Sequence, residues 1–335
     1  MRYEASVSSV SWIPSEAVTG LPRHAFEAGM VHYDRPPTDR IAGLSDLVEA
    51  GRDDAFRFAN RLAGWVEVRG GSIVRAGYAT DSSGVMGAST VRVGPWSSRM
   101  SAVALPLRRA SVRSTADRAT FRQTFGGRAA MPAPRRVARP PYVQLRAPVV
   151  WTTLELELDA TGRPAYRLAG ASRFPRHWIY DNDGRLAQKS GLTDFAAWYR
   201  TGAGDPSPWG GEDSPTLVSA VESALERSAA STLMLNRPRV RSYPAGTVLL
   251  RAGERGDEMY LVLDGMLRVE VRGRVVALLG PGSVVGERAR LGTGVRTATV
   301  TAETPLRVAA ATPNELDPAT LTGLGREHTR EDEQD

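Results

Sequence analysis

The chain has 335 residues, a formal net charge of +6 and no cysteine. The absence of cysteine excludes disulfide bonds and thiolate metal sites and fits a reducing compartment, so we expect a cytoplasmic protein. Because no N-terminal apolar run and no apolar stretch of about 18 residues is present, we expect neither a signal peptide nor a membrane span.

The positive charge does not point to a nucleic-acid partner. Nearly all cationic side chains are arginines, Lys189 is the only lysine, and the arginines are scattered among predicted strands instead of forming one block. We therefore expect no direct DNA binding. The length predicts two domains, each with an ample core.

Residues 1–200 read as a mainly antiparallel β domain, either a barrel or a strongly bent sheet with few short helices. A short amphipathic helix is expected around residues 41–48, and a hairpin is expected around Gly70-Gly71. Alternating apolar and polar side chains predict the strands, which are residues 6–13, 65–68, 73–78, 89–93, 100–107, 119–125, 143–147, 151–158, 165–168, 177–180 and 185–189. A further short helix is expected over residues 194–200.

The Gly-, Pro- and Arg-rich stretch 126–141 is predicted to form no regular element. It is interpreted as a surface loop or a polyproline stretch. The alternative is an arm that docks on an acidic partner.

Several residues before position 200 could carry chemistry. His24, His32 and His177 lack the spacing of a zinc site, and residues 181–184 (Asp-Asn-Asp-Gly) lack the later ligands of a calcium loop, so we expect no metal and read the latter as a hairpin turn. We expect no catalytic residues. An enzymatic alternative stays open, with His177, Tyr180 and Asp181 converging in a pocket.

Residues 201–215 are rich in Gly, Pro and Asp and are predicted to be a linker. Ser214 and Pro215 fit the cap and the first position of a helix over residues 216–235, whose apolar residues form one stripe. We take residues 216–312 as the second domain.

The stretch 281–300 has the chemistry of an anion site. Gly286 lets the backbone approach a ligand closely, and the short helical turn that follows presents unpaired N–H groups. Arg296 can pair bidentately with a phosphate. Glu287 would repel a phosphate, so it should accept a hydrogen bond from a neutral donor such as a ribose hydroxyl. A nucleotide satisfies both requirements.

These residues resemble the phosphate-binding cassette of cyclic-nucleotide-binding domains. The order G-E-x-A-x-L from Gly286, followed by R-T-A-T-V from Arg296, fits that pattern, and the upstream run from Tyr243 to Gly265 fits the family as well. The resemblance covers about residues 236–312, and it implies an eight-stranded jelly roll. It also implies that Glu287 takes the ribose 2′-hydroxyl, that Arg296 takes the cyclic phosphate, and that ligand-binding residues are Gly286, Glu287, Arg288, Ala289, Arg296 and Thr297.

Three features depart from the family pattern. Val285 stands where Phe is common, and Arg288 and Arg290 stand at usually apolar positions. The family's lid helix after the barrel has no counterpart, because residues 313–335 read as a short, polar, disordered tail, so the lid is shortened or comes from elsewhere. This tail is also too short for the helix-turn-helix of the family's transcription factors.

The sequence thus predicts a cytoplasmic regulatory protein that binds cAMP or cGMP and needs no other cofactor. cAMP is favoured only by its frequency in the family, since Thr297 suits either base. We expect the second domain to control the first or its protein partner. The first domain resembles only uncharacterised actinobacterial proteins, and homo-oligomerisation is left open. The alternatives are a nucleotide-gated enzyme and an interaction module with a vestigial pocket.

Overall fold

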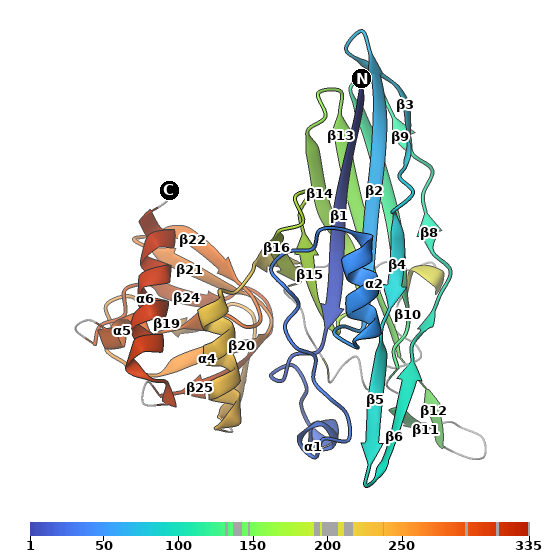
Figure 1. Ribbon diagram of the computed structural model, residues 1–335. Coiled ribbons are helices and arrows are strands. Elements are labelled where there is room, and N and C mark those ends of the chain that lie inside the picture. The colour runs from blue at the N-terminus through green and yellow to red at the C-terminus, as the bar shows by residue number, and fades with distance from the viewer. Residues whose placement is uncertain are drawn as a thin grey trace. The chain divides into compact units, whose positions relative to one another are not determined.

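The computed structural model describes residues 1–130, 133–136, 143–146, 148–190, 195, 207–210, 217–236, 238–291, 294–312 and 315–333. The chain divides into two compact units (Figure 1). The first comprises Met1–Pro14, Val18–Gln188 and Asp194–Thr216, and the second comprises Ser15–Ala17, Lys189–Thr193 and Leu217–Asp335. In the part of the chain that is described, no helix has the length and apolarity to cross a bilayer.

The first unit is built on two antiparallel sheets. One has the order β16-β15-β1-β2-β3, with β4 also on β2, and the other has the order β14-β13-β10-β7, with β8 and β9 also on β10. Their bounds are β1 Arg2–Trp12, β2 Phe58–Arg69, β3 Ser72–Tyr78, β4 Ser83–Met86, β7 Val103–Ala104, β8 Arg108–Arg109, β9 Arg113–Ser114, β10 Arg118–Arg128, β13 Val149–Asp159, β14 Pro164–Ala171, β15 Arg176–Tyr180 and β16 Leu186–Ser190.

The two sheets pack face to face through β1, β2, β10 and β13. A Cβ on Gly64 of β2 would lie 2.9 Å from the ring of Phe121 of β10, so the layers approach closely there. Buried polar groups also bridge the layers: the Ser9 and Thr152 hydroxyls are 2.8 Å apart, and Gln123 Nε2 donates to Asn60 Oδ1 at 2.9 Å. The mainly β prediction is confirmed, but the barrel alternative is wrong, because the described strands form two separate sheets.

The described residues of the first unit also form two hairpins and three helical segments, which are β5 Ala88–Val93 with β6 Trp96–Ser101, β11 Ala133–Arg136 with β12 Val143–Arg146, α1 Leu21–Glu27, α2 Leu44–Arg52 and η1 Pro208–Gly210. The helix expected around residues 41–48 is α2, whose Leu47 packs with Trp12 and Trp178. The helix expected over residues 194–200 lies outside the described residues except Phe195.

The prediction of no regular element in 126–141 is wrong where the structure describes this stretch. Strand β10 runs on to Arg128, and β11 forms at residues 133–136. A Cβ on Gly126 would collide with the carbonyl of Val150, and one on Gly127 with the carbonyl of Val103. These glycines therefore allow close strand approach instead of forming a loop.

The second unit contains a jelly roll of two four-stranded antiparallel sheets, ordered β18-β25-β20-β23 and β19-β24-β21-β22. This agrees with the expected eight strands. Their bounds are β18 Arg239–Tyr243, β19 Val248–Leu250, β20 Met259–Asp264, β21 Leu267–Val271, β22 Arg274–Leu279, β23 Val284–Val285, β24 Thr299–Ala302 and β25 Leu306–Ala311; a short strand, β17 Val218–Ala220, precedes them.

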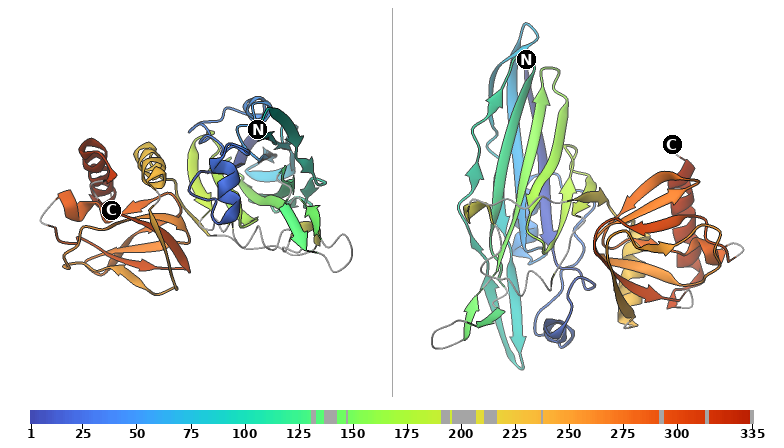
Figure 2. Two further views of the ribbon diagram at one scale, coloured as in Figure 1. Left: turned by 90° about the horizontal axis from the view of Figure 1, so that it is seen from below. Right: turned by 180° about the vertical axis from the view of Figure 1, so that it is seen from behind.

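Helices α4 (Ala224–Leu235) and α6 (Pro318–Glu333) lie side by side on one side of the jelly roll (Figure 2), and α5 (Arg288–Leu291) follows β23. The expected start of the first helix at residue 216 is wrong, because β17 intervenes and Ser223 and Glu226 form a capping box. The expected disordered tail is also wrong over residues 318–333. Helix α6 forms there because Leu321 and Leu324 are buried in the same apolar cluster as Leu233.

Candidate functional site

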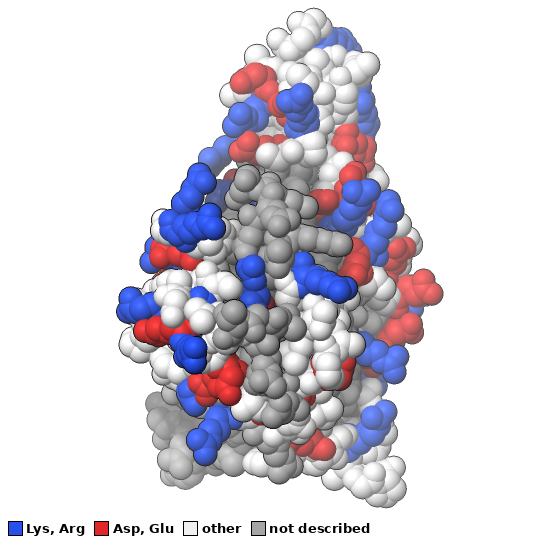
Figure 3. Space-filling model, turned by 90° about the vertical axis from the view of Figure 1, so that its left-hand side faces the viewer, with Lys and Arg blue, Asp and Glu red and all other residues white. Residues whose placement is uncertain are grey.

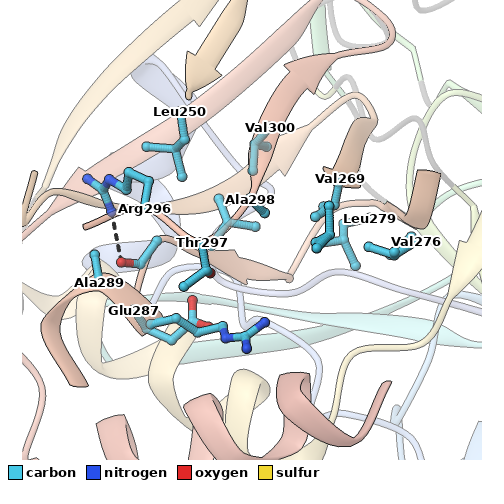
Figure 4. A pocket seen from close by; sticks show the side chains of 15 residues that line it. Leu250, Val269, Val276, Leu279, Glu287, Ala289, Arg296, Thr297, Ala298 and Val300 are labelled. Carbon is cyan, nitrogen blue, oxygen red and sulfur yellow. Dashed lines mark hydrogen bonds between the residues drawn. The ribbon is translucent and has the colours of Figure 1, made fainter. Parts of the chain in front are cut away.

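A pocket that is partly open to solvent lies in the second unit (Figure 4); its empty space, with the open part included, is about 650 Å³. One wall is apolar and comes from β19, β21, β22 and β24; it includes Leu250, Val269, Val271, Val276, Leu279 and Val300. The polar side chains of the lining are Glu287, Arg288, Arg296 and Thr297, which belong to the segment 286–300, hereafter the cassette. All six residues expected from sequence line this one pocket, namely Gly286, Glu287, Arg288, Ala289, Arg296 and Thr297.

Gly286 forms the turn between β23 and α5. Its φ of 97° lies in the left-handed region, which residues with a side chain rarely adopt. A Cβ there would lie 2.8 Å from the carbonyl oxygen of Glu258 and 2.9 Å from Nη1 of Arg296. Both backbone conformation and space therefore require glycine at the point where the chain enters the pocket.

Arg296 is only 7% exposed, and its guanidinium lies between two backbone segments. Nη1 donates to the carbonyl oxygen of Gly286 at 2.9 Å, the bond drawn in Figure 4, and Nη2 donates to that of Glu258 at 2.7 Å. A Cβ on Gly256 would lie 2.9 Å from Nη2, so a second glycine makes room for the guanidinium. A buried, oriented arginine thus stands at the polar end of the pocket.

Glu287 is 2% exposed, and its carboxylate points toward the pocket in Figure 4. Ala289 is buried, Thr297 is exposed and Arg288 is half-buried. The pocket therefore joins an apolar chamber to a cationic and an anionic group. A ligand that fits it would carry a flat apolar part, a hydroxyl donor and an anion.

Three side chains that sequence reasoning left without a role support Arg296. Arg241 holds the Glu258 carboxylate bidentately at 2.9 and 2.7 Å, and the Tyr260 hydroxyl donates to it at 2.6 Å. Burial alone would raise the pKa of Glu258, but the bonds from Tyr260 and Arg241 lower it below its usual value. This network fixes the residue whose carbonyl orients Arg296. Glu258 and Tyr260 fall in the upstream run that resembles the family, which was the signal available for them, whereas Arg241 lies just before that run.

The alternative site at His177, Tyr180 and Asp181 does not converge. His177 is fully buried, with Nδ1 2.7 Å from Ser11 Oγ and Nε2 2.8 Å from the carbonyl oxygen of Ser172. The Tyr180 hydroxyl donates to the carbonyl of Thr38, and Asp181 accepts from backbone N–H groups of its own turn. Each side chain thus makes its own structural contacts.

An eight-stranded jelly roll with this pocket and cassette defines a domain of the cyclic-nucleotide-binding class. Residues 240–319 match the family model of the cyclic nucleotide-binding domain, which confirms the resemblance in the sequence. The second unit therefore contains a member of that domain family.

Relatives match over the same domain. The chain is 44% identical over 66 residues to a cyclic nucleotide-gated potassium channel of Mesorhizobium japonicum, covering 20% of this chain and 18% of the channel. It is 41% identical over 68 residues to a cAMP-dependent protein kinase regulatory subunit of Schizosaccharomyces pombe, covering 20% and 16%. The match spans less than a fifth of either relative, so the likeness is one of a single domain.

Solved structures match over about a third of the chain. The Thermus thermophilus catabolite activator protein is 27% identical, with a TM-score of 0.27, covering 33% of this chain and 57% of that one. A cAMP-bound PfPKA-R fragment is 22% identical, with a TM-score of 0.28, covering 33% and 39%.

Proposed function

We propose that the second unit binds a cyclic nucleotide, cAMP or cGMP, and that the protein is regulatory. The observation that carries this proposal is the buried pair of opposite charges, Arg296 and Glu287, at the polar end of an apolar pocket. A cyclic nucleotide presents a planar base, a 2′-hydroxyl and a singly charged phosphate in that order.

In this proposal each cassette residue has one role. Arg296 donates hydrogen bonds from N–H groups of its guanidinium to the cyclic phosphate. Glu287 accepts the hydrogen bond of the ribose 2′-hydroxyl. Gly286 and Ala289 contribute backbone N–H groups near the start of α5, and Thr297 contributes its hydroxyl. The apolar wall, with Val269 and Leu279, receives the base.

The first unit is the proposed output module, which acts directly or through a protein partner in the cytoplasm. The ligand can bias this unit only through a difference in affinity between two arrangements of the chain. On the face of the protein seen in Figure 3, arginine and acidic side chains alternate among the coloured residues. The described part of that face therefore shows no basic stripe of the kind that nucleic-acid binding calls for.

Isothermal titration calorimetry with cAMP, cGMP and AMP tests the binding. We expect heat with at least one cyclic nucleotide, none with AMP, and loss of that heat in Arg296→Ala. The matched control is Arg251→Ala, which removes an exposed arginine of the same unit whose Nε lies 3.6 Å from Oε1 of Glu254. Heat from neither cyclic nucleotide would overturn the proposal.

A further inference from the structure

Lys189 is the only lysine among 43 Lys and Arg residues, and it is 0% exposed. Its Nζ lies 2.7 Å from Oε2 of Glu222, which is also buried, and 3.3 Å from the hydroxyl of Ser283. All three residues belong to the second unit. A buried ammonium is costly unless it is paired and hydrogen-bonded, so the structure fixes this lysine in one place.

The residue after Ser283 is held by a second acid of the same segment. The N–H of Val284 donates to Oε1 of Glu226 at 3.0 Å. The other oxygen of Glu226 accepts from the N–H of Ser223 at 2.9 Å and so completes the cap of helix α4. Glu226 directly, and Glu222 through Lys189, thereby tie the start of α4 to Val284, the first residue of β23, and to Ser283 before it.

Strand β23 leads directly into the cassette. Val285 is followed by Gly286, whose carbonyl accepts the hydrogen bond of Arg296. A phosphate that binds the guanidinium of Arg296 therefore changes the force that this side chain exerts on Gly286. The backbone passes that change on to Val284 and Ser283. Lys189 is the next side chain in that sequence of contacts.

We propose that Lys189, through its contacts with Glu222 and Ser283, links the state of the cassette to strand β16. Lys189 is the fourth residue of β16, and the residue before it, Gln188, is the last of that segment of the first unit. Ligand binding thus reaches the first unit along the backbone of its own strand. This inference rests on the proposed nucleotide binding and adds the route by which binding is transmitted.

The use of lysine in an arginine-rich chain fits this role. An ammonium is a compact point donor that can reach a carboxylate and a hydroxyl at once, whereas the planar guanidinium of arginine needs a wider, fork-shaped partner. Ser283 and Glu222 present two single acceptor atoms at short range, which suits the ammonium.

Hydrogen–deuterium exchange of peptides covering residues 176–190, with and without saturating cyclic nucleotide, tests the inference. The test variant is Lys189→Met with Glu222→Gln, because removing both charges leaves neither one buried alone. We expect the double variant to keep nucleotide affinity within about tenfold, the scale of typical coupling, while the ligand-induced change in exchange at residues 186–190 disappears.

The matched control replaces an ion pair of the first unit, Arg61→Met with Asp81→Asn, whose charged atoms are 2.8 Å apart. It should keep the ligand-induced change. If the wild-type protein binds no cyclic nucleotide, the proposed function fails, and this inference fails with it. If the protein binds but exchange at residues 186–190 does not respond, or responds equally in the double variant, the inference alone is overturned.

Discussion

The guanidinium of Arg296 donates a 2.9 Å hydrogen bond to the carbonyl oxygen of Gly286, ten residues earlier in the chain. This bond closes the cassette between its first residue and its principal cation. The second NH₂ group of the guanidinium donates to the backbone carbonyl of Glu258. One side chain therefore sets both the shape of the cassette and its charge.

The planar shape of the Arg296 guanidinium, in addition to its charge, should matter for cyclic-nucleotide affinity. Arg296→Lys retains the positive charge but cannot bridge two carbonyls and a phosphate. We expect cyclic-nucleotide affinity to fall about 10- to 100-fold, the worth of one or two charge-assisted hydrogen bonds. Calorimetry measures it, and an affinity equal to wild type would show that charge alone suffices.

Gly286→Ala should destabilise the second unit. The left-handed φ costs about 1 kcal/mol, and the close approach to Glu258 adds to it, for a total of about 2–3 kcal/mol. Urea unfolding monitors the loss. Gly273→Ala is the control, since Gly273 has a φ of 79° but no atom within 4 Å of a Cβ. Equal losses in the two variants would show that the contact with Glu258 adds nothing.

Glu287→Gln should discriminate between ligands that differ at one atom. If Glu287 accepts the ribose 2′-hydroxyl, the variant loses about tenfold in affinity, since a hydrogen bond to a charged group is worth about 1.5 kcal/mol or more. The 2′-deoxy form of the same cyclic nucleotide, titrated against both proteins, is the test. Wild type and variant should bind the deoxy ligand alike, whereas an undiminished tenfold gap would assign Glu287 another role.

The first unit should lose stability in acid through His177. Burial lowers the pKa of His177 from 6.5 to about 4, although its hydrogen bond to Ser172 opposes the shift. Between these values the unfolded chain takes up a proton that the folded chain does not, so stability falls as the pH drops from about 6.5 to about 4, by about 3 kcal/mol.

Urea midpoints of the first unit from pH 4 to pH 7 measure this loss. His177→Asn should flatten the dependence over that range. A curve for His177→Asn as steep as that of wild type would assign the acid sensitivity to other groups.

Helix α6 should contribute to the stability of the second unit. Leu324 is fully buried in the cluster shared with α4. Leu324→Ala should cost about 2–5 kcal/mol in free energy of unfolding, read from urea unfolding. Arg326→Ala, on an exposed position of the same helix, is the control; a loss below 1 kcal/mol at Leu324 would mean that α6 packs only loosely.

The second unit was more predictable from sequence than the first. The cassette is local: Gly286, Glu287 and Arg296 lie within eleven residues, so spacing alone brings them together. The support of Arg296 by the Glu258 carbonyl could not be foreseen, because a backbone acceptor 38 residues away leaves no mark in the sequence. Helix α6 was not predicted, because the charged residues at the end of this segment are typical of a disordered tail. Asp317, which accepts from the N–H groups of Ala319 and Thr320, was a readable N-cap.

In the first unit the strands were predictable and their partners were not. Alternation identifies a strand, but β1 pairs with β15 across some 166 residues, and only the fold sets that pairing. The stretch that begins with Gly126 and Gly127 was predicted to be irregular, whereas both glycines lie in β10. Glycine is common in flexible loops and also where two strands approach closely, so its presence alone does not distinguish the two. The sequence likewise gives no sign that the amides of Asn60 and Gln123 are buried, because each finds its partner on the opposing sheet.

The burial of Lys189 removes the one lysine of this sequence from amine-directed reagents. Its ε-amino group should not react with an activated ester while the protein stays folded around it. A label that appears on Lys189 would therefore report that the polar cluster around it has opened, and the labelling rate would measure how often that happens.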